Sequence, residues 1–166
     1  MKMDTVKRGG TIELEVTDVA FGGRGIAKLD GMVIFVEGAL PGDRVLATVT
    51  RKKPQYAEAT TAEILRPSEA RIAAPCPVFG ACGGCKWQNY RYEEQLRAKQ
   101  RHVEDALRHI GRQQASYDMR PIIPSPDPWH YRNKMEFSFG WADQPGSRAV
   151  GTGPSRSVFT WRATSA

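Results

Sequence analysis

The sequence is poor in cysteine: it has three, and all of them lie between positions 76 and 85. No thiol elsewhere can act as a catalytic nucleophile, and three cysteines cannot all pair as disulfides. No apolar run approaches the roughly 18 residues of a membrane-spanning helix. The first ten residues contain no apolar segment of a secretory signal, and no Gly-rich fingerprint of a nucleotide-type cofactor site occurs. We therefore expect a cytoplasmic monomer without membrane contact, and we assign it no catalytic residue.

Basic residues are in excess over acidic ones. The formal net charge is +6 and the sequence pI is about 9.4. Residues 1–75 hold 11 Lys and Arg against 10 Asp and Glu, whereas residues 86–166 hold 13 against 8. Lys and Arg neutralise phosphates, so this balance favours a polyanionic partner.

The three cysteines stand in the segment CPVFGACGGC with the spacing C-x5-C-x2-C. Thiolates that converge usually share a soft metal or an iron–sulfur cluster, which makes Cys76, Cys82 and Cys85 candidate ligands. Structural zinc is an alternative, because zinc accepts three cysteines and one histidine, and the chain has three histidines. Unliganded thiols are a further alternative. A structural disulfide is disfavoured, since clustered thiols without a secretory signal indicate a reducing compartment.

Short strands account for residues 11–65. Period-two alternation begins at Thr11, and glycine-rich turns separate the runs GIAKL and MVIFV from two later strands at 45–50 and 56–65. Asp30-Gly31 predicts a tight hairpin turn. Five short strands with such turns predict a small closed barrel of the OB type. Residues 1–10 have the polar composition of a frayed start.

OB-type barrels commonly bind nucleic acid on one face. Phe21, Arg24 and the basic turn Arg51-Lys52-Lys53 are the candidate contacts. Taken one by one, each is also compatible with an ordinary surface residue or a core aromatic.

A helix is predicted for residues 89–112, with Asn89 capping its start and Gly111 its end. Its apolar positions recur at helical spacing and share one face: Tyr92, Leu96, Val103, Leu107 and Ile110. Residues 113–128 are rich in proline, which predicts a stiff linker. The segment HYRNKMEFSFGW then alternates as a strand, and Arg132 and Lys134 would project together from it.

Barrel, C-x5-C-G-G-C loop and YRNKMEFSFG strand, in this order, resemble the bacterial RNA uracil-C5 methyltransferases that methylate ribosomal RNA. The resemblance covers roughly residues 8–142. It implies a mainly β chain with some α structure: a TRAM-like RNA-binding barrel at 1–66, an iron–sulfur cysteine loop at 67–88, the helix at 89–112 and the linker at 113–128. Residues 129–150 then resemble the start of an antiparallel central β domain that binds RNA.

The resemblance also implies cofactors and contacts. The family transfers a methyl group from S-adenosylmethionine to C5 of uridine, in ribosomal or, as an alternative, transfer RNA. Its [4Fe-4S] cluster is held by four cysteines, three of which match Cys76, Cys82 and Cys85. The segment that faces RNA in the family matches Arg132, Asn133 and Lys134.

The sequence departs from the family in its last part. No fourth cysteine follows Cys85, and no S-adenosylmethionine-binding domain is recognisable. Residues 151–166 are an atypical tail with no clear periodicity, and disorder is one interpretation of it. A change of reading frame near position 150 is a hypothesis that translation of the downstream DNA would test. A stand-alone RNA-binding module and a zinc-stabilised adaptor stay open as alternative functions.

Overall fold

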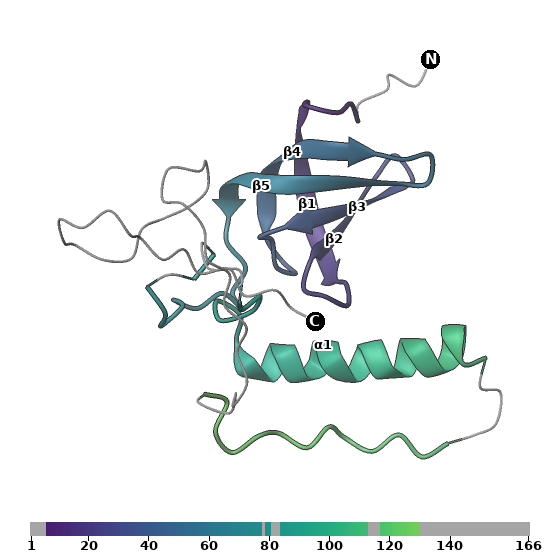
Figure 1. Ribbon diagram of the computed structural model, residues 1–166, viewed down its shortest axis with the longest axis vertical. Coiled ribbons are helices and arrows are strands. Elements are labelled where there is room, and N and C mark those ends of the chain that lie inside the picture. Colours follow the sequence, from purple (N-terminus) through teal and green to yellow (C-terminus); the bar gives the residue numbers. More distant parts are fainter. Residues whose placement is uncertain (1–5, 78, 81–83, 113–116, 130–166) are drawn as a thin grey trace, which may run out of the picture. The chain divides into compact units, whose positions relative to one another are not determined.

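The computed structural model describes residues 6–77, 79–80, 84–112 and 117–129 (Figure 1). The chain divides into two compact units, one of residues 1–72 with 89–124 and one of residues 73–88 with 125–166. The helices and strands found among these described residues all lie in the first unit: β1 (Thr11–Val19), β2 (Gly25–Leu29), β3 (Met32–Glu37), β4 (Arg44–Lys52), β5 (Tyr56–Arg66), α1 (Tyr92–Asp105) and the π-helix η1 (Ala106–Ile110). Among the described residues, no helix has the length and apolar character needed to cross a membrane.

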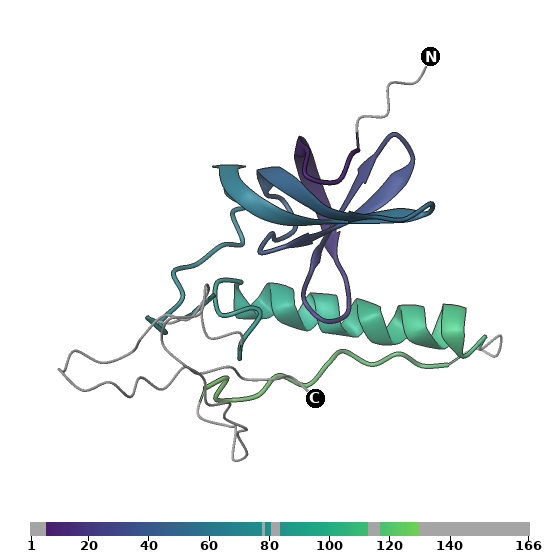
Figure 2. The ribbon, with the colours of Figure 1, turned by 45° about the horizontal axis from the view of Figure 1, so that its top comes forward.

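The five strands close into a barrel in the order β1-β2-β3-β5-β4, which Figures 1 and 2 show from two directions. All neighbouring pairs are antiparallel except β3 and β5, which run parallel. The predicted five-stranded OB-type barrel is therefore confirmed. Closure leaves no free sheet edge in the barrel, so it needs no further strand to complete its hydrogen bonding.

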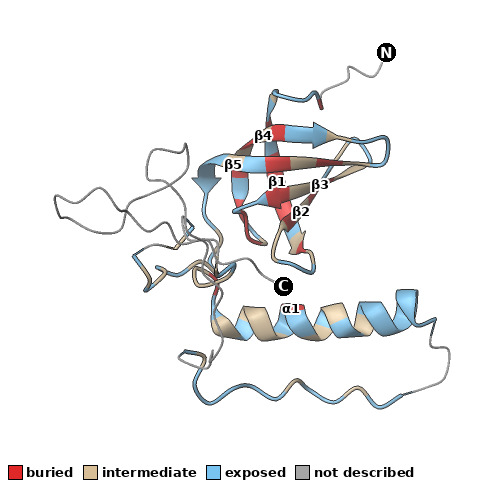
Figure 3. Ribbon diagram, in the orientation of Figure 1, coloured by how far each residue is buried: buried red, intermediate tan, exposed pale blue. Residues whose placement is uncertain are grey.

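Alternation along each strand builds the core of the barrel. In β1 the residues alternate between exposed and buried from Thr11 to Val16, and Ile34 and Val36 of β3 are fully buried. Figure 3 shows these buried positions gathered on the strands of the barrel. Short side chains, mostly Val, Ala and Ile, fill the interior, as a barrel of this size requires.

The N-terminal segment is part of the barrel, so the interpretation of residues 1–10 as a frayed start is wrong for residues 6–10. Val6 is buried in the core cluster. Gly9 N–H donates to the Val49 carbonyl at 2.8 Å, and Val49 N–H donates to the Gly10 carbonyl at 2.9 Å. These bonds hold the segment along β4, because a buried apolar anchor offsets the polar composition around it.

The turn between β2 and β3 has the predicted hairpin form. Leu29 pairs with Met32, and Asp30 and Gly31 between them have φ of 50° and 82°. Two consecutive positive φ values are what a type I′ turn needs, and Asp-Gly accepts them at low cost. The hairpin fixes the register of β2 and β3 and thereby the outward direction of their alternate side chains.

A buried ion pair joins the β3–β4 connection to the segment after β5. Asp43 is fully buried, and its carboxylate accepts hydrogen bonds from Leu40 N–H, Ser68 N–H and the Arg71 guanidinium. The Arg71 side chain also donates to the Gly38 carbonyl at 2.9 Å. Every oxygen of the buried carboxylate thus has a partner, which is the condition for tolerating a charge in the interior.

The long helix was predicted, but its first turn differs from the prediction. The N-cap is Arg91, which makes no side-chain capping bond, so the predicted Asn89 cap is wrong. Asn89 lies in a turn instead, where its carbonyl accepts from Ile72 N–H, and Tyr90 forms an isolated bridge with Arg71 before the helix begins. At the other end η1 finishes at Ile110 and Gly111 is its C-cap, as predicted.

The apolar face predicted for the helix is only partly covered. Ala98 is the buried residue of α1, whereas Val103 and Ile110 are 52% and 83% exposed. The helix keeps the predicted periodicity without the burial that usually accompanies it.

Candidate nucleic-acid interface

The outer surface of β2, β3 and β5 carries an aromatic pair. Phe35 lies between the fully buried Ile34 and Val36, so its side chain leaves the barrel on the opposite face. Tyr56 opens β5 and precedes the buried Ala57, which gives it the same outward direction. The two rings meet edge to face, with centroids 5.8 Å apart and planes at 76°.

Arg24 places its guanidinium over one ring of the pair, Phe35. Its Cζ lies 5.0 Å from the centre of the Phe35 ring, within the range of a cation–π contact. Nη1 of Arg24 lies 3.6 Å from Oε1 of Glu58, and both side chains are partly exposed. Stacking and the ion pair together orient Arg24, one of the predicted contact residues, over the outer face.

Sequence reasoning missed Phe35 and Tyr56. The pattern MVIFV was treated as one apolar run, although alternation places Ile34 and Val36 inside and Phe35 outside. The informative signal was the register: an aromatic residue out of phase with the buried positions of a strand is an outer-surface residue.

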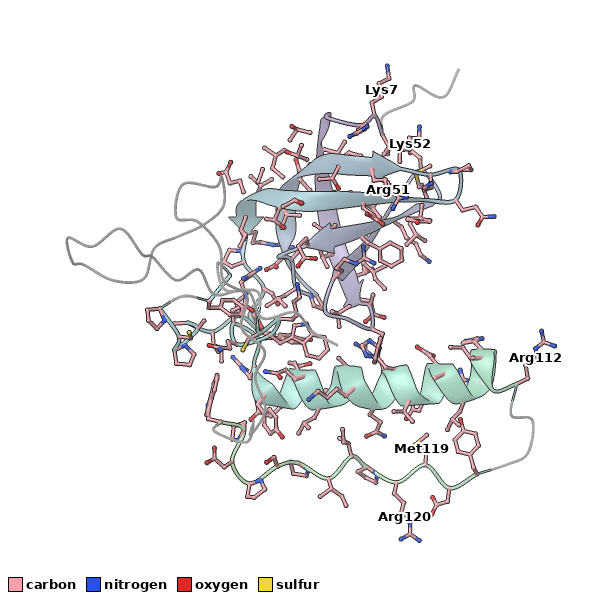
Figure 4. All side chains as sticks on the ribbon, in the orientation of Figure 1. Lys7, Arg51, Lys52, Arg112, Met119 and Arg120 are labelled. Atoms are coloured by element: carbon pink, nitrogen blue, oxygen red, sulfur yellow. The ribbon has the colours of Figure 1, made fainter. Side chains whose placement is uncertain are left out.

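A group of basic residues lies where β4 ends. The predicted turn is shorter than expected, because β4 continues through Arg51 and Lys52, and only Lys53 of the three begins the turn. Lys53 N–H donates to the Tyr56 carbonyl at 2.8 Å, which closes the turn. Figure 4 shows Arg51 and Lys52 at this end of the barrel together with Lys7.

The N-terminal segment supplies the basic residues that sequence reasoning missed. Its hydrogen bonds to Val49 bring Lys7 and Arg8 beside β4. We call Lys7, Arg8, Arg51, Lys52 and Lys53 the basic edge. Treating residues 1–10 as frayed removed Lys7 and Arg8 from consideration, and only the buried Val6 anchor could have reversed that.

Phe21, the remaining predicted barrel contact, stands on the β1–β2 turn and is 89% exposed. Its ring and that of His102 of α1 form a T-shaped pair, with centroids 6.2 Å apart and planes at 72°. His102 Nε2 lies 2.8 Å from the Val19 carbonyl, and Arg101 Nη2 donates to Asp18 Oδ1 at 2.9 Å. The turn is therefore tied to the helix, and Phe21 still projects most of its ring into solvent.

The predicted cysteine site is only partly described. Cys76 is half-buried and its N–H donates to Gln88 Oε1 at 3.3 Å, whereas Cys85 is exposed. Cys82 lies outside the described residues. The donor chemistry of three closely spaced thiols fits three corners of an iron–sulfur cluster, and the cluster stays a prediction.

The predicted RNA-facing residues of the central domain, Arg132, Asn133 and Lys134, lie outside the described residues, as do residues 130–150 and the tail at 151–166. The described part of the linker, residues 117–128, contains no helix or strand.

The sequence is similar to a known domain family and to several known proteins. The TRAM domain family matches residues 5–62, the span of the barrel. An uncharacterized RNA methyltransferase of Chlorobaculum tepidum is 48% identical over 134 residues, which cover 80% of this chain and 28% of that protein. An uncharacterized RNA methyltransferase of Gloeobacter violaceus is 43% identical over 145 residues, which cover 87% of this chain and 31% of that protein.

A third relative has a more specific name. The 23S rRNA (uracil(1939)-C(5))-methyltransferase RlmD of Bordetella parapertussis is 39% identical over 146 residues, covering 88% of this chain and 31% of that protein. The chain thus contains a TRAM domain and is homologous to the N-terminal part of RNA methyltransferases. It spans about 30% of the length of these relatives.

Proposed function

We propose that this TRAM-containing chain is the N-terminal, RNA-binding and iron–sulfur portion of an S-adenosylmethionine-dependent RNA uracil-C5 methyltransferase that acts on ribosomal RNA in the cytoplasm. The similarity to proteins named RNA methyltransferases over 76–88% of the chain carries this proposal. The basic edge and the outer aromatic pair support it physically, because a cationic surface beside exposed rings suits a nucleic-acid strand.

Within this proposal the chain binds and orients RNA, and the methyl transfer belongs to the remaining two-thirds of the relatives' length. The basic edge neutralises phosphates, which gives affinity that is independent of base sequence. None of the described residues is assigned a chemical step. The purified 166-residue chain should accordingly bind RNA and should not methylate it.

Binding to a ribosomal RNA fragment tests the function. Fluorescence anisotropy with a labelled 23S rRNA fragment should show saturable binding that S-adenosylmethionine leaves unchanged. Because phosphate contacts are independent of base sequence, a transfer RNA should compete for this chain, and the choice of ribosomal RNA would belong to the rest of the protein. Absence of binding to either RNA would contradict the proposal.

We further propose that Cys76, Cys82 and Cys85 hold three corners of a [4Fe-4S] cluster, which would stabilise the loop around it. Anaerobically purified protein should be brown and contain iron and sulfide, and Cys85→Ser should lower both. A colourless protein with one equivalent of zinc would contradict the cluster and favour a zinc-stabilised adaptor.

A stand-alone RNA-binding module is the second candidate function. The observation in its favour is that the barrel closes on itself within β1–β5 and has its own core. Under this alternative the chain would bind RNA in the cell without any methyltransferase partner. Deletion of the gene would then leave the uridine methylation of ribosomal RNA unchanged, as measured by mass spectrometry of nucleosides.

A further inference from the structure

We propose that the outer face of β2, β3 and β5 is a base-stacking platform, on which Phe35, Tyr56 and Arg24 receive an unpaired nucleotide of the bound RNA. The inference rests on the proposed RNA-binding function and assigns to it a defined site. The site adjoins the basic edge at Lys53, which precedes Tyr56 in the turn between β4 and β5, and the basic edge supplies the contacts to phosphates. We call the three residues the stacking platform.

The outward direction of the rings is the first observation. Ile34, Val36 and Ala57 fill the barrel interior from the positions next to Phe35 and Tyr56. The rings therefore contribute little to the core, and both remain partly exposed on the outer face. The two rings pack against each other outside the barrel, and the part of each ring that stays exposed is apolar surface on which a flat base can stack.

The register of the strands places further suitable groups beside the rings. Lys28 pairs with Val33, and Val33 pairs with Tyr56, so the three residues form one row across β2, β3 and β5. Two interstrand spacings separate Lys28 from Tyr56, about 10 Å. At one end of the row is the exposed side chain of Lys28. At the other end Lys53, also exposed, begins the turn that leads into Tyr56.

Arg24 makes the platform more than an apolar patch. Its guanidinium is planar and lies over Phe35, and the ion pair with Glu58 holds it there. A guanidinium stacked on an aromatic ring offers a second flat surface for a base and a positive charge for the adjacent phosphate. This combination of rings and cations is typical of sites for single-stranded nucleic acid.

A paired base cannot use such a site, because its faces are already stacked within the helix. The platform should therefore prefer unpaired RNA over a duplex of the same length. It should also discriminate weakly among bases, since every base has a flat face.

Substitution of the rings gives the main test. The full chain is titrated into a fluorescein-labelled 12-nucleotide oligouridine, and anisotropy gives the Kd. Phe35→Leu and Tyr56→Leu should each weaken binding about 5- to 150-fold, the range for one base stacked on one ring. Tyr56→Phe, which keeps the ring, should bind within about twofold of the native chain.

Two controls separate stacking from charge and from general damage. Tyr117→Leu makes the same change at another exposed tyrosine of the segment after η1 and should leave the Kd unchanged. The slope of log K against log [KCl] should be the same for Phe35→Leu as for the native chain. Lys53→Gln should instead make that slope shallower by about 0.7, the effect of one lost phosphate contact.

A second measurement does not depend on the variants folding. An oligouridine with one central 2-aminopurine should lose fluorescence when the native chain saturates it, because stacking quenches this base. No quenching on saturation would overturn the proposal, as would native affinity in both folded leucine variants. If the native chain still binds RNA in those cases, the proposed function stands and the platform alone fails. If the native chain binds no RNA, both fail.

Discussion

The Asp43–Arg71 pair supports a quantitative prediction about stability. The carboxylate of Asp43 is fully buried and the Arg71 side chain is 16% exposed. Nε and Nη2 of Arg71 approach the carboxylate oxygens at 2.8 and 2.7 Å in a bidentate arrangement. Replacing Arg71 by Gln removes the cation and leaves the buried negative charge with only its backbone donors.

The magnitude follows from the burial. Breaking a buried ion pair from one side costs about 3–5 kcal/mol, because the remaining charge stays desolvated without its partner. The Gly38 carbonyl also loses its bond from Arg71. Arg71→Gln should therefore lower the free energy of unfolding by about 3–5 kcal/mol, a large share of the stability of a small domain.

Urea denaturation followed by far-ultraviolet circular dichroism measures this change for the full chain. Arg44→Gln is the matched control, because Arg44 pairs with Glu13 on the barrel surface, where both side chains are about half-exposed. Exposed pairs contribute about 0–1 kcal/mol. Equal losses in the two variants would refute the assignment of Asp43–Arg71 as the pair that holds the segment after β5 to the barrel.

Two further predictions concern pH and packing. Burial, followed by the nearby Glu94 carboxylate, raises the pKa of Tyr90 above its usual 10.0. The unfolded chain therefore releases the phenol proton before the folded chain does, and stability present below about pH 10 is lost as the pH rises through the folded pKa. The native chain should therefore have a lower urea midpoint at about pH 11 than at about pH 8, and this difference should be smaller in Tyr90→Phe. An equal difference in the two chains would contradict the raised pKa of Tyr90. Gly25→Ala should destabilise the barrel by about 1–3 kcal/mol in the same assay. The added Cβ would lie 2.8 Å from Val16 Cγ1 and 3.0 Å from the Ala39 carbonyl oxygen, both too close. A loss of stability below about 0.5 kcal/mol would contradict this and show that the strands move apart easily.

The barrel was predictable from the sequence because it has one buried face. Buried and exposed residues then alternate along the strands, and Asp30-Gly31 marks the hairpin between β2 and β3 without ambiguity. The N-terminal segment was not predictable in the same way. Val6 is a single apolar residue among polar ones, and only its place in the completed core reveals its role.

The sequence did not predict the first residue of the helix or the contact between Phe35 and Tyr56, and the reason is a different one. Asn89 is a good local cap, but the long-range bridge between Arg71 and Tyr90 holds the next residue outside the helix, whose N-cap is Arg91. Phe35 and Tyr56 are 21 residues apart and meet only through the parallel pairing of β3 and β5. Local patterns cannot predict contacts that depend on which strands become neighbours.

The most direct test of the account is the salt dependence of RNA binding by the 166-residue chain. The Kd for a ribosomal RNA fragment is measured between about 50 and 200 mM KCl, the range in which phosphate contacts are lost. If all five cations of the basic edge contact phosphates, log K should fall linearly against log [KCl] with a slope near −3.5, and Lys52→Gln should reduce that slope by about 0.7. Binding that does not change with salt, or no binding at all, would contradict the claim that this barrel holds RNA.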